Sequence, residues 1–205
     1  MHFSKSFEDD EEYEIIDCTK LDNNMLIVKE KLDDNRHYVV KLKKNQYAVL
    51  FEKGKIYDSI KEEGVYIIRN EPNMSYQEEF IDYEIKNNDD KLCILFFNMN
   101  IITGNKFYIK KKRKNDFYGE GNFDFKIENP LKLFNKVITV RNFYSREELL
   151  EQIREKITKI VISVIKESGR KYILDEDFIN SSLNIFKEYG IAIVSSDLEN
   201  IEFKI

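Results

Sequence analysis

A change in hydrophobic periodicity near residue 145 constrains the fold of this chain more than any other feature of its sequence. Before this point, apolar residues alternate with polar ones or gather in short runs, which is typical of β-strands. After it they recur every three or four positions, which is typical of amphipathic helices. The sequence therefore predicts an α+β fold. It comprises an antiparallel, β-rich region over about 15–141, two helices over about 145–190, and a terminal strand over about 191–205.

Nine segments of the β-rich region have the composition of strands, with many Val, Ile, Tyr and Phe residues. They are Leu26–Lys31, His37–Leu42, Tyr47–Phe51, Val65–Ile68, Glu79–Ile85, Lys91–Asn98, Lys106–Lys112, Phe117–Ile127 and Lys136–Val140. Polar clusters that favour turns separate several of them. These clusters are Asp33–Asn35, Lys43–Asn45, Lys53–Lys55 and Glu62–Gly64. The pattern predicts that consecutive strands form hairpins.

Two helices are predicted, each with recognisable ends. Ser145 can cap the first helix, and Glu148 completes a capping box. Gly169 supplies the left-handed residue that follows its last turn. The second helix runs from about Asp175 to Tyr189 and ends at Gly190. Because the first helix is rich in β-branched residues, packing must stabilise it rather than intrinsic propensity.

The charges of the chain nearly cancel, but they are unevenly distributed. Thirty-three basic and 38 acidic residues give a net charge of -5 and a pI near 5.3, which argues against a dedicated nucleic-acid binder. Acidic residues gather in 1–14, which we expect to be a solvated tail, with docking to a basic partner as the alternative. No secretory signal and no apolar run of about 20 residues is present, so we expect a cytoplasmic chain.

Few residues have the chemistry of an active site. His37 begins a strand beside two acidic turn residues, where it is either a general base or a solvated residue at a strand end. Cys93 lies in the most apolar stretch and Cys18 beside the acidic N-terminus, and neither place favours a reactive thiolate. Gly119–Gly121 lies within a strand rather than before a helix, so it is not a phosphate loop. We therefore expect no catalytic residues, no metal and no cofactor.

One basic patch stands out at the tip of a predicted hairpin. It consists of Lys110, Lys111, Lys112, Arg113 and Lys114. These cations could meet an anionic membrane surface, bind single-stranded nucleic acid with the help of nearby aromatic residues, or protect a sheet edge from aggregation. Each gains about 1 kcal/mol near an anionic bilayer, so one copy binds weakly whereas an assembly binds strongly through avidity.

Several stretches resemble those of a known family. Asn45–Ile56 resembles the first hairpin of that family, which ends in a glycine turn, and Gly64–Ile68 resembles the G-x-Y strand that follows this hairpin. Gly119–Phe134 resembles the family's segment that leads from the strands into the helices. Lys187–Ile191 is similar to the place where the family's last helix meets its last strand. Their order over most of the chain resembles the SPFH family (stomatin, prohibitin, flotillin and HflK-type proteins), in particular the YdjI-like "virion core protein" branch.

The resemblance implies one SPFH-like domain over 15–205 with a non-enzymatic scaffold function. Such a scaffold self-associates and organises, or is recruited to, a membrane surface or a partner protein, in bacteria in connection with envelope stress. It implies a cytoplasmic homo-oligomer that lies peripherally at the inner face of the membrane. The chain departs from this branch in having no Trp. The alternative is an accessory protein that binds nucleic acid through Lys110–Lys114.

Overall fold

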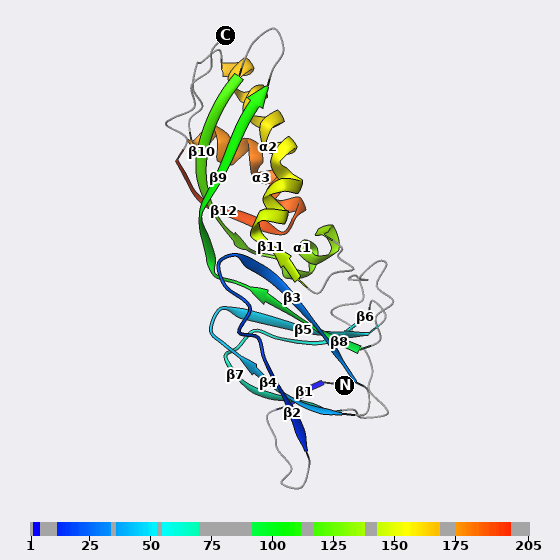
Figure 1. Ribbon diagram of the computed structural model, residues 1–205. Coiled ribbons are helices and arrows are strands. Elements are labelled where there is room, and N and C mark those ends of the chain that lie inside the picture. The colour runs from blue at the N-terminus through cyan, green and yellow to red at the C-terminus, as the bar shows by residue number, and fades with distance from the viewer. Residues whose placement is uncertain are drawn as a thin grey trace. The chain divides into compact units, whose positions relative to one another are not determined.

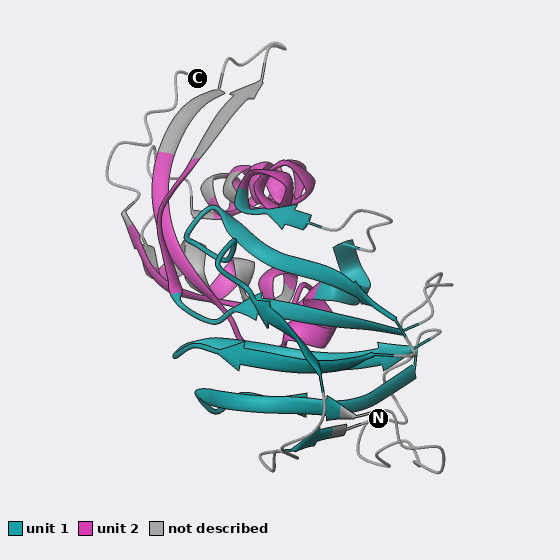
Figure 2. Cartoon of the chain, turned by 60° about the horizontal axis from the view of Figure 1, so that its bottom comes forward, with its two compact units in different colours: residues 1–100, 134–146 teal, residues 101–133, 147–205 magenta. Residues whose placement is uncertain are grey.

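A computed structural model describes most of the chain as two compact units. The described residues are 2–4, 12–33, 36–52, 55–69, 92–111, 117–137, 143–168 and 175–197. One unit comprises residues 1–100 and 134–146, and the other comprises 101–133 and 147–205 (Figure 2). The strands form three sheets, and the combination of sheets with helices agrees with the predicted α+β class (Figure 1).

Two sheets make up most of the first unit. Their strands are β1 (His2–Ser4), β2 (Tyr13–Asp17), β3 (Met25–Leu32), β4 (His37–Leu42), β5 (Gln46–Glu52), β6 (Lys55–Ile60), β7 (Gly64–Arg69), β8 (Leu92–Asn98) and β11 (Phe143–Ser145). The four-stranded sheet has the order β1-β7-β4-β2, and the five-stranded sheet has the order β11-β3-β8-β5-β6. Strands β2 and β4 run parallel, so the expectation of a wholly antiparallel region is wrong at this pair.

Chain reversals in the first unit mostly carry the chain from one sheet to the other. The predicted turns at Asp33–Asn35, Lys43–Asn45 and Glu62–Gly64 each join strands of different sheets, so no hairpin forms there. The turn at Lys53–Lys55 does join a hairpin, between β5 and β6. Polar turn residues set where the chain reverses, whereas the partner of each strand depends on which apolar faces pack together.

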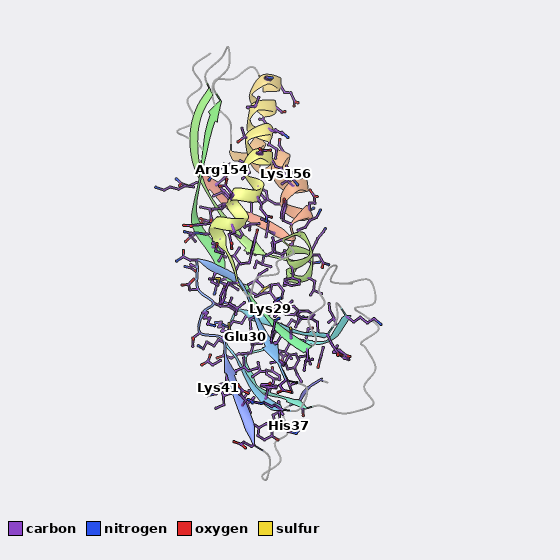
Figure 3. The ribbon with its side chains drawn as sticks, turned by 45° about the vertical axis from the view of Figure 1, so that its right-hand side comes forward. Lys29, Glu30, His37, Lys41, Arg154 and Lys156 are labelled. Atoms are coloured by element: carbon purple, nitrogen blue, oxygen red, sulfur yellow. The ribbon has the colours of Figure 1, made fainter. Side chains whose placement is uncertain are left out.

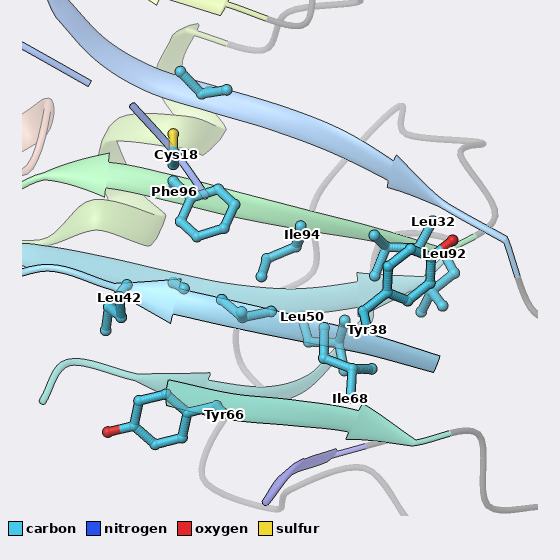
Figure 4. Close-up of a cluster of buried hydrophobic side chains, with 13 residues drawn as sticks. Cys18, Leu32, Tyr38, Leu42, Leu50, Tyr66, Ile68, Leu92, Ile94 and Phe96 are labelled. Carbon is cyan, nitrogen blue, oxygen red and sulfur yellow. The ribbon is translucent and has the colours of Figure 1, made fainter. Parts of the chain in front are cut away.

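Side chains from both sheets form a common core in the first unit (Figure 4). Leu50, Ile94 and Phe96 of the five-stranded sheet and Val40 and Ile68 of the four-stranded sheet have no exposed surface. Burial of each such side chain contributes roughly 1.5–3 kcal/mol. The alternation of apolar residues in the sequence thus supplies the inner faces of a two-layered β structure.

Strand β8 is buried at every position because apolar side chains cover both of its faces. On the face opposite the common core, Phe134 packs against Phe51 and Phe97, with ring centroids 6.1 and 6.4 Å apart. Phe134 belongs to a short helix, α1 (Pro130–Val137). The continuous apolar run in the sequence of β8 reflects this two-sided burial.

Helix α1 replaces part of a predicted strand. The prediction of a strand over Lys136–Val140 is wrong at its first two residues, which belong to α1. The physical reason lies at the start of the helix, where Asn129 Oδ1 accepts a hydrogen bond from the Lys132 N–H at 2.9 Å. Pro130 occupies the first helical position, where its missing N–H costs nothing.

The second unit combines a three-stranded sheet with two longer helices. The sheet has the order β12 (Ile191–Asp197), β10 (Phe117–Ile127) and β9 (Ile101–Lys111). Helices α2 (Arg146–Ser168) and α3 (Asp175–Glu188) confirm the two predicted helices to within a residue or two at each described end. The rings of Phe123 in β10 and Phe186 in α3 meet edge to face, 5.6 Å apart. These contacts join helix and sheet into one core.

The described parts of the N-terminal segment, 2–4 and 12–14, contain strand residues. Strand β1 and the first residues of β2 lie within 1–14, so the prediction of a tail is wrong for them. The Phe3 N–H donates a hydrogen bond to Asp58 Oδ2 at 2.8 Å, and the Phe3 ring meets Tyr66. An apolar anchor among the acidic residues thus secures this end of the chain.

Seven of the nine predicted strands are confirmed, with small changes at their ends. The largest change is in β9, which begins at Ile101 rather than Lys106. Strands β1, β2, β6 and β11 were not predicted. The predicted strand Glu79–Ile85, the predicted cap Gly169, and the last part of the predicted terminal strand, 198–205, lie outside the described residues.

Candidate functional site

The basic run lies where strands β9 and β10 are joined. Strand β9 ends at Lys111 and β10 begins at Phe117, and the two strands pair in antiparallel fashion. In this register Lys110 is opposite Tyr118, and Lys111 is opposite Phe117. The remaining three cations of the run, Lys112, Arg113 and Lys114, lie outside the described residues. The backbone of Lys110 and Lys111 therefore lies at the end of the paired strands, where the sequence predicted a hairpin tip.

The outer part of this hairpin is a two-stranded ribbon. Strand β12 pairs with β10 over Asn122–Ile127, whereas β9 pairs with β10 along almost its whole length. Among the described strands, Phe117–Gly121 therefore pairs with β9 alone. Figure 1 shows β9 and β10 continuing together past the end of β12. The five residues Phe117–Gly121, at about 3.4 Å each, place Lys111, the partner of Phe117, about 17 Å beyond the three-stranded part.

Asp124 links all three strands at the base of the ribbon. Its Oδ1 accepts a hydrogen bond from the Gly104 N–H of β9 at 2.9 Å. Its Oδ2 accepts one from the Ser195 hydroxyl of β12 at 2.8 Å. The strand register shifts next to Asp124 on both sides, and Gly104 has a φ of +67°. These shifts are β-bulges, which increase the local twist and bend the strands.

A buried amide stabilises the same region. Asn105 is 1% exposed, and its Nδ2 donates hydrogen bonds to the carbonyl oxygens of Ile102 and Phe123, at 2.7 and 2.9 Å. The backbone pairing of β9 with β10 is interrupted between Phe123 and Phe125. At this interruption the Asn105 side chain donates to the two backbone carbonyl oxygens. Asp124 and Asn105 together determine how the ribbon leaves the sheet.

Two helices of the second unit are tied together by a charged side chain, Lys156 (Figure 3). Its Nζ lies 3.2 Å from Glu188 Oε2 and 4.8 Å from the centre of the Tyr189 ring. Burial of Lys156 lowers its pKa, but the hydrogen bonds to Glu188 and Tyr189 and their charges outweigh this effect. The pKa of Lys156 is therefore raised above its ordinary value.

His37, the candidate general base, lies at the start of β4 (Figure 3). Its ring meets the edge of Tyr13 at 6.1 Å. Its Nδ1 is buried, and the described residues provide no hydrogen-bond partner for it. Asp33, one of the nearby acids, instead lies 3.8 Å from Arg36. A general base is normally oriented by a partner at its second nitrogen, so this geometry does not support a catalytic histidine.

Both cysteines are buried thiols. Burial raises the pKa of Cys18 to about 11, and the charge of Glu30 adds a smaller increase. Desolvation, rather than the neighbouring acid that the sequence suggested, is thus the main reason why Cys18 is unreactive. Cys93 has no exposed surface.

Within the ranges that the structure describes, no group of three His, Cys, Asp or Glu side chains could hold a metal ion. The same ranges contain no helix that is long and apolar enough to cross a membrane. Comparisons of the chain with protein-family models and with curated proteins found no match. Function must therefore be argued from the charge and geometry of the chain itself.

Proposed function

We propose that this chain is a non-enzymatic scaffold of the SPFH type, which self-associates and is recruited to an anionic membrane surface through its basic run. The observation that carries the proposal is the position of Lys110 and Lys111 at the closed end of the β9–β10 ribbon. As in the bacterial proteins that the sequence resembles, such a scaffold would act in envelope stress. It would be cytoplasmic and peripheral at the inner face of the membrane.

Membrane recruitment is supported by the concentration of charge at the ribbon end. Five consecutive cations each gain about 1 kcal/mol near an anionic bilayer. The net charge of -5 means that the rest of the chain is repelled by the same surface. Binding therefore favours an approach by the ribbon end, and it should weaken steeply with salt because the cations are separated from lipid phosphates by solvent.

Self-association would compensate for the small energy that one copy can gain. About 5 kcal/mol at best, reduced by the acidic remainder of the chain, gives weak binding. Several linked copies engage the surface together, and the second and later contacts are then effectively intramolecular. A scaffold built from several copies thus gains an affinity that a monomer lacks.

The alternative function is binding of single-stranded nucleic acid by the same ribbon. The register sets Tyr118 opposite Lys110 and Phe117 opposite Lys111, so each of these cations has an aromatic residue opposite it on the neighbouring strand. Aromatic residues beside cations are typical of surfaces that stack bases and hold phosphates. The acidic pI of 5.3 argues for the membrane in preference to nucleic acid.

Sedimentation with vesicles of phosphatidylcholine alone, or of phosphatidylcholine with phosphatidylglycerol, tests recruitment. The triple variant Lys112→Gln, Arg113→Gln, Lys114→Gln should lower affinity for the anionic vesicles about 100-fold. The control variant Lys44→Gln, Lys61→Gln, Lys166→Gln removes the same charge from exposed positions elsewhere and should bind like the wild type. Equal loss in both variants would contradict a role for the ribbon end.

A single-stranded oligonucleotide, titrated at physiological salt, provides the second arm of this experiment. Tight binding to the oligonucleotide with no binding to anionic vesicles would favour the nucleic-acid function. If the protein binds neither the oligonucleotide nor the anionic vesicles, the proposal that its basic run recruits it to an anionic surface is wrong.

A further inference from the structure

The strands at the ends of the three sheets differ in charge. Within the described part of the chain, β1 and β2 end one sheet, β11 and β6 the second, and β12 and β9 the third. Strand β2 contains Glu14 and Asp17 and no basic residue. Strand β9 contains Lys106, Lys110 and Lys111 and no acidic residue. These two edges carry the largest net charges, and those charges are of opposite sign, whereas Lys55 and Asp58 of β6 cancel.

We propose that β2 of one copy pairs with β9 of a second copy, so that edge strands join the protein into a head-to-tail assembly. The proposal rests on the self-association part of the proposed function and specifies the surface that performs it. An edge strand presents a row of unpaired backbone N–H and C=O groups to a further strand. Opposite charges on the two edges select this pairing over the pairing of like edges.

An antiparallel register brings the charges into opposition. With 12–17 against 106–111, Glu12 is opposite Lys111 and Asp17 is opposite Lys106. Between these ends Ile15 is opposite Tyr108 and Ile16 is opposite Phe107, and opposed pairs of this kind favour sheet formation. Glu14 is opposite Ile109, and Tyr13 is opposite Lys110. A parallel alignment would also match the end charges, so the antiparallel register is preferred because antiparallel pairs are slightly more stable per residue.

Ile15 is the second feature that marks β2 as a docking edge. It is 60% exposed in the middle of the strand, an unusual place for a large apolar side chain. In the sheet register Ile15 lies opposite Val39, which lies opposite Ile67, and both of these are buried. A strand added at β2 would extend this apolar row and cover Ile15.

The acids of β2 already have neighbours of opposite charge on their own sheet. Glu14 lies 2.8 Å from Arg36, and Asp17 lies 3.2 Å from Lys43. These pairs are well exposed to solvent, and such surface pairs contribute little to stability. Asp17 can therefore share its carboxylate with the incoming Lys106 without a large loss, and Glu14, which is opposite Ile109 in this register, keeps its pair with Arg36.

Pairing of two different edges has a consequence for the size of the assembly. Such a contact is heterologous, because each copy offers one β2 and one β9, and the assembly grows either into a closed ring or into an open filament. The mass of the particle should rise with concentration. Lys110 and Lys111 belong both to the pairing strand and to the basic run, whereas the three cations after Lys111 are outside the pairing. Substitutions at 112–114 therefore weaken membrane binding without changing the paired strands.

A charge-swap experiment, read by light scattering, tests the pairing. Variant Lys106→Glu, Lys111→Glu and variant Glu12→Lys, Asp17→Lys should each associate at least about tenfold more weakly than the wild type. An equimolar mixture should recover association, since the acidic β9 of one variant then faces the basic β2 of the other. Recovery also demonstrates that both variants are folded.

Cysteine cross-linking under oxidising conditions tests the register. A tagged Ile15→Cys chain mixed with a Tyr108→Cys chain should form a mixed disulfide, because the proposed register sets these positions opposite each other. The native cysteines are buried, so they should not compete. The matched control is Val194→Cys on the β12 edge, which is 45% exposed and should not cross-link with Ile15→Cys.

The outcomes separate this proposal from the proposed function. If the wild type associates but the swap restores nothing and Ile15→Cys does not cross-link with Tyr108→Cys, the β2–β9 pairing is wrong and the scaffold function stands. Cross-linking of Ile15→Cys with Val194→Cys instead would identify β12 as the partner and overturn the pairing. A wild type that is monomeric at every concentration would refute both the pairing and self-association, while vesicle binding is measured independently.

Discussion

The Asp124 carboxylate accepts a hydrogen bond from the Ser195 hydroxyl at 2.8 Å, although the two residues are 71 positions apart in the chain. Its other oxygen accepts the Gly104 N–H of the strand on the opposite side. One side chain thus spans the three-stranded sheet at the point where both registers shift. The ribbon that carries the basic run therefore starts from a bend that Asp124 holds in place.

Replacing Asp124 by Ala should destabilise the protein by about 1–2 kcal/mol, because two hydrogen bonds to a charged acceptor are lost at a partly exposed site. Urea unfolding measures the change. Glu63→Ala removes an exposed acid from the first unit and should alter stability by less than about 0.5 kcal/mol. Equal stabilities for the two variants would show that the Asp124 bonds contribute nothing.

Gly104 and Gly190 have nearly identical φ angles but different surroundings, so the effects of substituting them can be compared. Gly190 has a φ of +68° and Gly104 a φ of +67°. A Cβ at Gly190 would lie 2.3 Å from the Asn129 carbonyl oxygen, whereas a Cβ at Gly104 would meet nothing within 4 Å. Gly104→Ala should cost about 1 kcal/mol from backbone strain alone, and Gly190→Ala at least about 2 kcal/mol more. Thermal unfolding should show that Gly190→Ala is less stable than Gly104→Ala. The reverse order would contradict the close approach of Gly190 to the Asn129 carbonyl oxygen.

Cys18 should resist thiol reagents in the folded protein. Its pKa is raised from about 9 to about 11, so almost none of it is thiolate at pH 8. The raised pKa also predicts a contribution to stability that is complete below pH 9 and is lost as the pH rises towards 11. Labelling by a disulfide reagent should be slow and should accelerate in urea, while an Ile15→Cys variant labels at once. Rapid labelling of native Cys18 would refute its burial.

Lys156→Met should reduce stability only slightly, by up to about 1 kcal/mol, because the ion pair with Glu188 is still partly exposed to solvent. The raised pKa of Lys156 means that its contribution is present at neutral pH and is lost as the pH rises through that pKa. Wild type and variant should therefore converge in alkaline urea titrations. A difference that persists at high pH would indicate lost packing instead.

Features set by neighbouring residues were predictable from the sequence. The bounds of α2 and α3 follow from the 3.6-residue period and from residues that end helices, such as Gly190 with its positive φ. Strand β8 follows from its continuous apolar run. The short helix α1 was missed, although Asn129 and Pro130 form a recognisable start to a helix.

Features set by distant residues were not predictable. Turn residues mark each reversal, but the pairing of β2 with β4 depends on which faces bury together in two sheets. The basic run could be located because its charges are consecutive in the sequence. The hydrogen bonds of Asp124 at the base of the β9–β10 ribbon could not be predicted, because their donors, Gly104 and Ser195, lie 20 and 71 positions away in the chain. A Gly-Asn pair at 104–105 was the one local sign of irregular backbone there.

The mass of the native particle, measured by light scattering with and without anionic vesicles, tests the scaffold function most directly. The chain weighs 24.6 kDa, and we expect a particle of several times this mass that binds anionic vesicles and releases them at high salt. If the particle has a mass of 24.6 kDa at all concentrations and does not bind anionic vesicles, the proposed function is contradicted.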